Sequence, residues 1–176
     1  MAKDIDYLKS LIRSIPDFPA PGVLFRDITT MLKEPGALSL AVEAMLGRFA
    51  RTEVDLIAGI ESRGFILAAP LALRLGCGMV PIRKPGKLPA PTLSQEYQLE
   101  YGRDAVELHR DAIRPGQRVL LVDDVLATGG TMTAARQLVE GLGGKVAGIS
   151  LLIELTFLDG REKLGGCPVE SVIQYT

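Results

Sequence analysis

The densest cluster of potentially reactive residues runs from Val119 to Thr131, in the sequence VLLVDDVLATGGT. An apolar run leads into two adjacent carboxylates, Asp123 and Asp124, and then into the turn ATGGT. Gly129 and Gly130 allow backbone conformations that other residues avoid and let amides approach a ligand, while the threonines add hydroxyl groups. A helix expected after the turn contributes unpaired N–H groups and a positive dipole end. The combination predicts an anion site suited to phosphate.

The two carboxylates restrict what that phosphate can be attached to. A bare dianion beside Asp123 and Asp124 would be repelled unless the carboxylates face hydroxyl groups or a bridging cation. A sugar diol that carries a phosphate meets this condition, whereas the GxxxxGK[ST] and GxGxxG nucleotide-binding patterns are absent here. The alternative is a strand that ends in a solvated acidic turn, with Thr131 capping the next helix. The whole run, in this order, favours a ribose-phosphate site.

Four apolar runs rich in β-branched residues are the candidate strands that position this motif. These runs are 55–60, 78–83, 118–124 and 146–155. Helix-like segments at 64–75 and 131–142 separate the first run from the second and the third from the fourth. Strand–helix–strand repeats imply parallel pairing, so we predict an α/β open sheet with helices on both faces, in one domain spanning 1–176. Ligands bind such sheets outside the carboxyl ends of the strands, which is where the motif should lie.

Two further helices and an ordered loop are expected before the sheet. Residues 3–13 and 35–51 carry apolar side chains at helical spacing, and Pro16 should end the first helix. The proline-rich stretch PDFPAPGVLFRDIT between them suits an ordered loop in a small lobe.

A second loop is expected at 84–97, which shows no periodicity and contains three prolines and a glycine. Loops of this length are usually functional or disordered, so this one is a lid or a linker. The segments LEY and AVELH, around Gly102 and Arg103, predict a hairpin that returns toward the sheet.

Composition excludes several classes of protein. The 176 residues are 47% hydrophobic and 23% charged, which is typical of a globular domain. With a net charge of -1, the protein lacks the broad positive field that non-specific binding to nucleic acids or membrane surfaces requires. Neither a nucleic acid nor a membrane is therefore expected as a partner. With no targeting run at its start and no apolar stretch near the roughly 18 residues of a membrane span, the chain is predicted to be cytoplasmic. Cys77 and Cys167 lack CxxC spacing and clustered histidines, which favours two reduced thiols.

The run VLLVDDVLATGGT resembles the phosphoribosyl pyrophosphate signature of type I phosphoribosyltransferases, and other segments resemble the adenine phosphoribosyltransferase family. These segments are FPAPGVLFRDIT near the start, ESRGF at 61–65, GKLPAPTLSQEYQLEYG at 86–102, REKL and the closing QYT. The resemblance implies the type I phosphoribosyltransferase fold, a mainly parallel twisted sheet flanked by helices. It also implies an N-terminal, base-binding hood within 1–34 and a flexible catalytic loop at 84–97.

The same resemblance implies which residues bind the donor, phosphoribosyl pyrophosphate. Asp123 and Asp124 would contact the ribose hydroxyls, with magnesium carried on the pyrophosphate and no direct protein site. The 5′-phosphate would be held by Ala127, Thr128, Gly129, Gly130 and Thr131. The leaving pyrophosphate would be bound by Ser62, Arg63, Lys84 and Lys87.

Each of these basic groups has a plainer interpretation. ESRGF could be a helix start with Arg63 in a surface ion pair, and Lys84 and Lys87 could belong to a solvated turn. An arginine fork can hold two phosphate oxygens at once, and a cationic ribosyl centre must be kept from water. The reaction class therefore favours a lid, with Tyr97 and Tyr101 on it.

For the base, the resemblance implies adenine binding by Leu24, Phe25 and Arg26. Phe25 could stack on the purine, although a buried core position is the commoner fate of a phenylalanine. Glu100 is the candidate acid–base residue; its alternative is a hairpin residue facing solvent, and donation would require a raised pKa. His109, the single histidine, is expected to be a strand or surface residue.

The activity implied is transfer of the 5-phosphoribosyl group to adenine, giving AMP and pyrophosphate in a Mg²⁺-dependent homodimer. One alternative is a phosphoribosyltransferase for another base. Others are a non-catalytic donor-sensing regulator of the same fold and a generic sugar-phosphate binding module. A nucleic-acid-binding regulator is disfavoured because the sequence has neither net positive charge nor a helix-turn-helix domain. A non-catalytic protein is disfavoured because the lid and Glu100 are present.

Overall fold

A computed structural model describes residues 2–99 and 102–176. The chain divides into two compact units, Met1–Ala44 and Met45–Thr176. Within the described residues, no helix combines the length and apolar character needed to cross a membrane.

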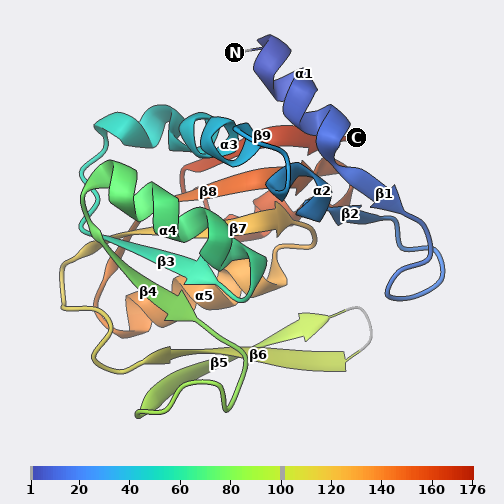
Figure 1. Ribbon diagram of the computed structural model, residues 1–176. Coiled ribbons are helices and arrows are strands. Elements are labelled where there is room, and N and C mark those ends of the chain that lie inside the picture. The colour runs from blue at the N-terminus through green and yellow to red at the C-terminus, as the bar shows by residue number, and fades with distance from the viewer. Residues whose placement is uncertain (1, 100–101) are drawn as a thin grey trace. The chain divides into compact units, whose positions relative to one another are not determined.

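The larger unit is built on a five-stranded, all-parallel sheet with strand order β4-β3-β7-β8-β9 (Figure 1). Its strands are β3 (Leu56–Ile60), β4 (Gly78–Ile82), β7 (Arg118–Leu126), β8 (Lys145–Leu155) and β9 (Val169–Tyr175). All four predicted strands are confirmed, and the inner strand β3 is buried along its whole length. The sequence did not reveal β9, because this edge strand mixes polar with apolar residues and is mostly half-exposed.

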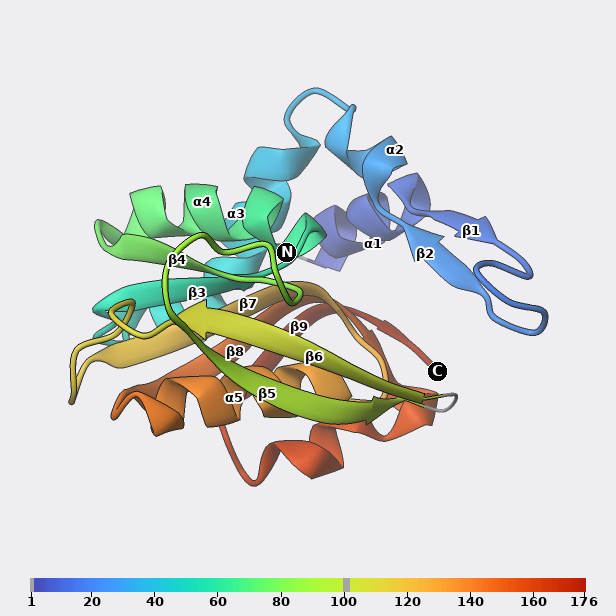
Figure 2. The ribbon, with the colours of Figure 1, turned by 90° about the horizontal axis from the view of Figure 1, so that it is seen from below.

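Two helices cover opposite faces of this sheet (Figure 2). Helix α4 (Arg63–Leu75) packs on the face that carries Gly59, where a methyl group would lie 2.7 Å from the Ala68 side chain. Helix α5 (Gly130–Gly141) belongs to the hydrophobic core of the other face. Both helices begin within one residue of the predicted start.

A separate antiparallel hairpin is formed by β5 (Thr92–Leu99) and β6 (Gly102–His109). Leu93 and Tyr97 of β5 and Val106 and Leu108 of β6 join the core that includes α5. The predicted hairpin is confirmed, but the predicted loop at 84–97 is corrected, because regular structure resumes at Thr92.

The smaller unit contains α1 (Ala2–Leu11), β1 (Arg13–Ile15), β2 (Phe25–Asp27) and α2 (Thr29–Leu32). The strands β1 and β2 pair antiparallel, so the stretch predicted as a loop ends in a short strand. The predicted helix at 35–51 is α3 (Ala37–Leu46), continued by a 3-10 helix, Gly47–Arg51.

Candidate active site

The site begins where neighbouring strands of the sheet end at different heights. The pairing of β3 with β7 stops at Gly59 and Val122, whereas β7 stays paired with β8 as far as Leu126 and Glu154. The last four residues of β7 therefore have a partner on one side only. This opening at the carboxyl edge is where a parallel sheet binds ligands.

A cavity of about 320 Å³ occupies that edge. It is lined by the end of β3, the start of α4, Lys84 and the segment from β7 into α5. The lining residues are Ile60, Glu61, Ser62, Arg63, Lys84, Asp123, Asp124, Val125, Leu126, Ala127, Thr128, Gly129, Gly130, Thr131 and Met132. Most of the residues predicted to bind the donor thus meet in one cavity.

The two carboxylates lie within β7 and not beyond it, because the strand runs to Leu126. Asp123 packs against the first turn of α4, where a methyl group on Gly64 would lie 2.9 Å from its Oδ1. Burial and the neighbouring Asp124 charge raise the pKa of Asp123 well above its ordinary value. The glycine therefore allows the start of α4 to approach a half-buried carboxylate.

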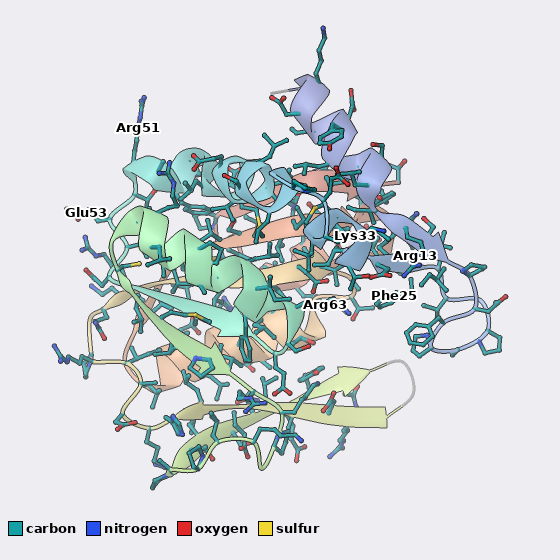
Figure 3. The ribbon with its side chains drawn as sticks, viewed as in Figure 1. Arg13, Phe25, Lys33, Arg51, Glu53 and Arg63 are labelled. Atoms are coloured by element: carbon teal, nitrogen blue, oxygen red, sulfur yellow. The ribbon has the colours of Figure 1, made fainter. Side chains whose placement is uncertain are left out.

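Arg63 holds the second carboxylate. Its Nε donates a hydrogen bond to Asp124 Oδ2 at 2.5 Å, while the Asp124 side chain is 4% exposed. Arg63 lies at the carboxyl end of the sheet, and Glu53 lies at the opposite end (Figure 3). With a third of its side chain exposed, Arg63 faces the cavity as well as its acidic partner.

The predicted phosphate loop connects β7 to α5. Gly129 has a φ of 79°, which favours glycine, and α5 begins at the next residue. The first residues of α5, Gly130, Thr131 and Met132, thus line the cavity beside the loop. At Gly130 a methyl group would lie 3.1 Å from the Tyr97 ring, so this glycine admits close packing of the hairpin.

Lys84 lines the cavity and is paired with residues of the β5–β6 hairpin. Its ammonium group donates hydrogen bonds to the Asp104 carboxylate and, at 2.7 Å, to the Tyr97 hydroxyl, which itself donates to Asp104 at 3.0 Å. Burial opposes the charge on Lys84, but these two partners raise its pKa above the ordinary value. Tyr97 was predicted to lie on a lid loop. It is instead 9% exposed and packs in strand β5 of the hairpin.

Glu61 and Arg83 support the cavity and were not predicted from the sequence. Arg83 donates two hydrogen bonds to the Glu61 carboxylate, at 3.1 and 3.4 Å, and the Lys84 backbone N–H donates a third at 2.9 Å. Hydrogen bonds from these two donors lower the pKa of Glu61 despite its burial. This network joins the end of β3 to the residues that follow β4. Glu61 opens the ESRGF segment and Arg83 ends the predicted strand 78–83, but no local pattern indicated that the two side chains would pair.

The other residues singled out in the sequence lie outside the cavity lining or outside the described residues. Among the described residues, Lys87 does not line the cavity, although its carbonyl accepts a hydrogen bond from Arg83. Glu100 and Tyr101 lie outside the described residues. His109 ends β6 as a half-buried residue whose Nε2 accepts a hydrogen bond from Ala90 N–H. Cys77 and Cys167 are free, half-buried thiols, and burial raises the pKa of each.

The segment predicted to bind the base lies in the smaller unit. Leu24 is 46% exposed, and Phe25 starts β2, where its ring meets Phe18 edge-on at 5.1 Å. Arg13 holds this small ribbon together by donating to Asp27 Oδ2 at 2.5 Å. Figure 3 shows Arg13 and Phe25 on this ribbon.

Proteins of known family resemble this chain over most of its length. The phosphoribosyl transferase domain family matches residues 29–164. An adenine phosphoribosyltransferase from Chloroflexus aurantiacus is 58% identical over 96% of this chain and 97% of its own length. The crystal structure of adenine phosphoribosyltransferase from Thermoanaerobacter pseudethanolicus is 54% identical, covers 97% of this chain and 99% of its own, and has a TM-score of 0.95. The Saccharomyces cerevisiae enzyme, complexed with adenine and an imino-altritol bisphosphate, is 39% identical over 98% and 99% of the two chains, with a TM-score of 0.91.

Proposed function

Because this chain belongs to the adenine phosphoribosyltransferase family, we propose that it transfers the 5-phosphoribosyl group from phosphoribosyl pyrophosphate to N9 of adenine. The products are AMP and pyrophosphate. The observation that carries the proposal is one cavity that joins paired carboxylates, a glycine-rich helix start and cationic side chains.

The donor is bound by complementary groups along this cavity. Asp123 and Asp124 accept hydrogen bonds from the ribose hydroxyls, and the 5′-phosphate sits on the loop Ala127–Thr131 at the start of α5. Both assignments follow from the chemistry of the groups. Carboxylates suit a diol and repel a phosphate, whereas free amides at a helix start attract one.

The leaving pyrophosphate is bound at the other end of the cavity by Ser62, Arg63 and Lys84, with Lys87 joining them from the loop. Arg63 is ion-paired to Asp124, and Lys84 is ion-paired to Asp104. Donor binding therefore exchanges carboxylate partners for pyrophosphate oxygens. Stabilisation of the charge that develops on the leaving group is the main contribution of these residues to catalysis.

Magnesium is proposed to enter with the donor. The cavity offers the oxygen donors Asp123 and Asp124, which suit a hard cation, while the described part of the chain contains no cluster of three potential protein ligands. These residues fit an ion held mainly by pyrophosphate oxygens and water. When bound, the ion neutralises charge on the leaving group.

The base is proposed to bind through Leu24, Phe25 and Arg26, an assignment supported by the family resemblance. Main-chain groups at Leu24 and Arg26 recognise the amino-purine edge, and the Phe25 ring provides a flat surface. Glu100 is proposed to exchange a proton with the purine ring. The residues that shield the reaction from water are proposed to lie within 84–91 and at Tyr101.

Two further properties are proposed from the family alone. The chain is expected to form a homodimer and to act in the cytoplasm as a purine-salvage enzyme.

Pyrophosphate release, measured with adenine, hypoxanthine and guanine at equal concentrations, tests the proposed function. We expect adenine to be the preferred base by kcat/KM. A preference for either 6-oxopurine would assign the chain to another base specificity, and release with none of the three would contradict the transferase activity.

A further inference from the structure

The segment that follows β8 packs directly against the proposed phosphate loop. It consists of two 3-10 helices, η2 (Thr156–Leu158) and η3 (Gly160–Leu164). At their junction, a methyl group on Gly160 would lie 2.1 Å from the Ala127 carbonyl oxygen and 2.9 Å from the Gly129 nitrogen. In the reverse direction, a methyl group on Gly129 would lie 2.4 Å from the Gly160 carbonyl oxygen. The two backbones touch without a side chain between them.

This contact fixes the shape of the phosphate loop from behind. Carbon and oxygen atoms that are not bonded pack at about 3.5 Å. A side chain at Gly160 would therefore displace the Ala127–Gly129 backbone by on the order of 1 Å. The amides of a phosphate loop act by their position, so a displacement of this size affects the ligand although Gly160 lies behind the loop.

An ion pair holds Gly160 in place. The neighbouring Arg161 donates to both oxygens of the Glu154 carboxylate, at 2.8 and 2.5 Å, and to the Val169 carbonyl at 3.0 Å. Ser171 donates a further hydrogen bond to Glu154 at 2.5 Å. Glu154 is 4% exposed, and its hydrogen bond with Arg161 lowers its pKa. Strands β8 and β9 thus anchor η3, because Glu154 of β8 and Val169 of β9 both accept hydrogen bonds from Arg161.

A second anchor lies at the other end of η3. Leu164 is fully buried in the core that contains α5, and Thr133 of α5 donates to the Gly129 carbonyl at 2.8 Å and to the Lys163 carbonyl at 3.4 Å. Gly160 is therefore held between two anchored points while it presses on the loop.

We propose that Gly160 and Arg161 are positioning residues for phosphoribosyl pyrophosphate, acting through the Ala127–Thr131 loop. The proposal rests on the function proposed above, because it assigns that loop to the 5′-phosphate. Neither residue lines the cavity among the described residues, so each acts through the loop.

The first test is Gly160→Ala. We expect KM for the donor to rise by roughly ten- to a hundredfold, as for a catalytic constellation misplaced by about 1 Å. KM for adenine should stay within about twofold of the wild type, because this contact lies behind the donor loop. Gly141→Ala is the matched control: its methyl group would lie 3.0 Å from the end of the flexible Leu93 side chain and should leave both constants unchanged.

The second test separates positioning from stability and applies even if Gly160→Ala does not fold. Arg161→Ala is compared with Arg118→Ala, which removes another two-pronged arginine–carboxylate pair, to Asp55 at 2.9 and 2.7 Å. The two arginines are similarly exposed, 44% and 38%, but Arg118 begins β7 at the end of the sheet away from the cavity. Both variants should lower the melting temperature. Only Arg161→Ala should raise the donor KM and weaken ribose 5-phosphate binding measured by calorimetry, by about fivefold or more.

Equal donor constants in Arg161→Ala and Arg118→Ala, or an unchanged donor KM in folded Gly160→Ala, would overturn the positioning role. In either case AMP formation by the wild type would leave the proposed function standing. A wild-type protein that makes no AMP would instead refute the function itself.

Discussion

Arg63 pairs with one of two adjacent acids in the cavity. Asp123 and Asp124 are adjacent acids at the edge of a cavity, and repulsion between them is relieved in two ways. Asp123 has a raised pKa, and Asp124 accepts a hydrogen bond from Arg63. The same guanidinium is proposed to hold pyrophosphate, so it connects the diol end of the cavity with the leaving-group end.

Arg63→Ala should therefore weaken donor binding and slow turnover. Loss of charge-assisted hydrogen bonds predicts a donor KM roughly ten- to a hundredfold higher and a lower kcat. The free energy of unfolding should also fall by about 1–3 kcal/mol, because Asp124 loses a hydrogen-bond donor in a buried position.

Steady-state kinetics and chemical denaturation measure these two effects. Arg63→Lys keeps the charge but not the fork, and should recover only part of the donor affinity. Unchanged steady-state constants in Arg63→Ala would contradict its assigned place.

At this scale the sequence predicts groups that share one continuous motif. Asp123, Asp124 and the loop glycines follow one another along the chain, so their chemistry can be recognised before folding. Glu61, Arg83 and Asp104 could not be predicted, because each acquires its partner only when separate strands meet. A single acid or base has no local pattern that distinguishes it from a solvated surface residue.

The hairpin β5–β6 determines where Lys84 lies. Asp104 and Tyr97 bind its ammonium group on the hairpin side of the cavity, so the hairpin competes with a bound pyrophosphate for the same cation. Asp104 is 32% exposed, so its ion pair with Lys84 should be about as weak as ion pairs at a protein surface.

Asp104→Asn should release Lys84 to the ligand. We expect pyrophosphate inhibition constants and the donor KM to fall by about two- to fivefold at low salt, with a smaller change at high salt. Glu96→Gln removes a carboxylate of the same hairpin that pairs with Arg103, and should change neither constant. Weaker pyrophosphate binding in Asp104→Asn would mean that Asp104 positions the lysine and does not compete for it.

The β1–β2 ribbon makes a prediction about pH. Hydrogen bonds from Arg13 and Thr29 lower the pKa of Asp27 from 3.8 to about 2. Because its pKa is lower in the folded state, ionised Asp27 stabilises the folded protein at pH values above its pKa in the unfolded chain. This stabilisation is lost as the pH falls from about 4 to about 2. Because Arg13 is largely exposed, we expect a contribution of only about 1 kcal/mol.

Asp27→Asn lacks this contribution at every pH. The difference in unfolding free energy between wild type and variant should therefore be present at neutral pH and close between pH values of about 4 and 2. Chemical denaturation across this range measures it, with Asp6→Asn, an exposed acid of α1, as the control. A gap that persists at the lowest pH would exclude the carboxylate charge as its source.

Elements were predictable where burial imposes a pattern. The inner strands are continuous apolar runs, and α4 and α5 have helical periodicity, so their positions could be inferred closely. Edge strand β9 and hairpin strand β5 are only partly buried. Their polar residues interrupt the apolar pattern by which a strand is recognised in a sequence. The loop prediction at 84–97 extended too far for this reason.

Across the larger unit, parallel strands deliver their carboxyl ends to one edge, where three separated segments build a single cavity. The order of strands could not be read from the sequence, because it depends on long-range pairing. The resemblance to a known family implied a mainly parallel sheet and the reaction in advance, but no strand order was predicted. The carboxylates, glycine-rich helix start and cationic side chains of the cavity independently favour a ligand with a diol, a phosphate and a second anionic group.

The most direct test of this account is an ultraviolet assay for AMP from adenine and phosphoribosyl pyrophosphate, with and without magnesium. We expect AMP in proportion to donor consumed when magnesium is present, and a large loss of rate when the ion is chelated. Absence of AMP with folded protein, under both conditions, would contradict the central claim.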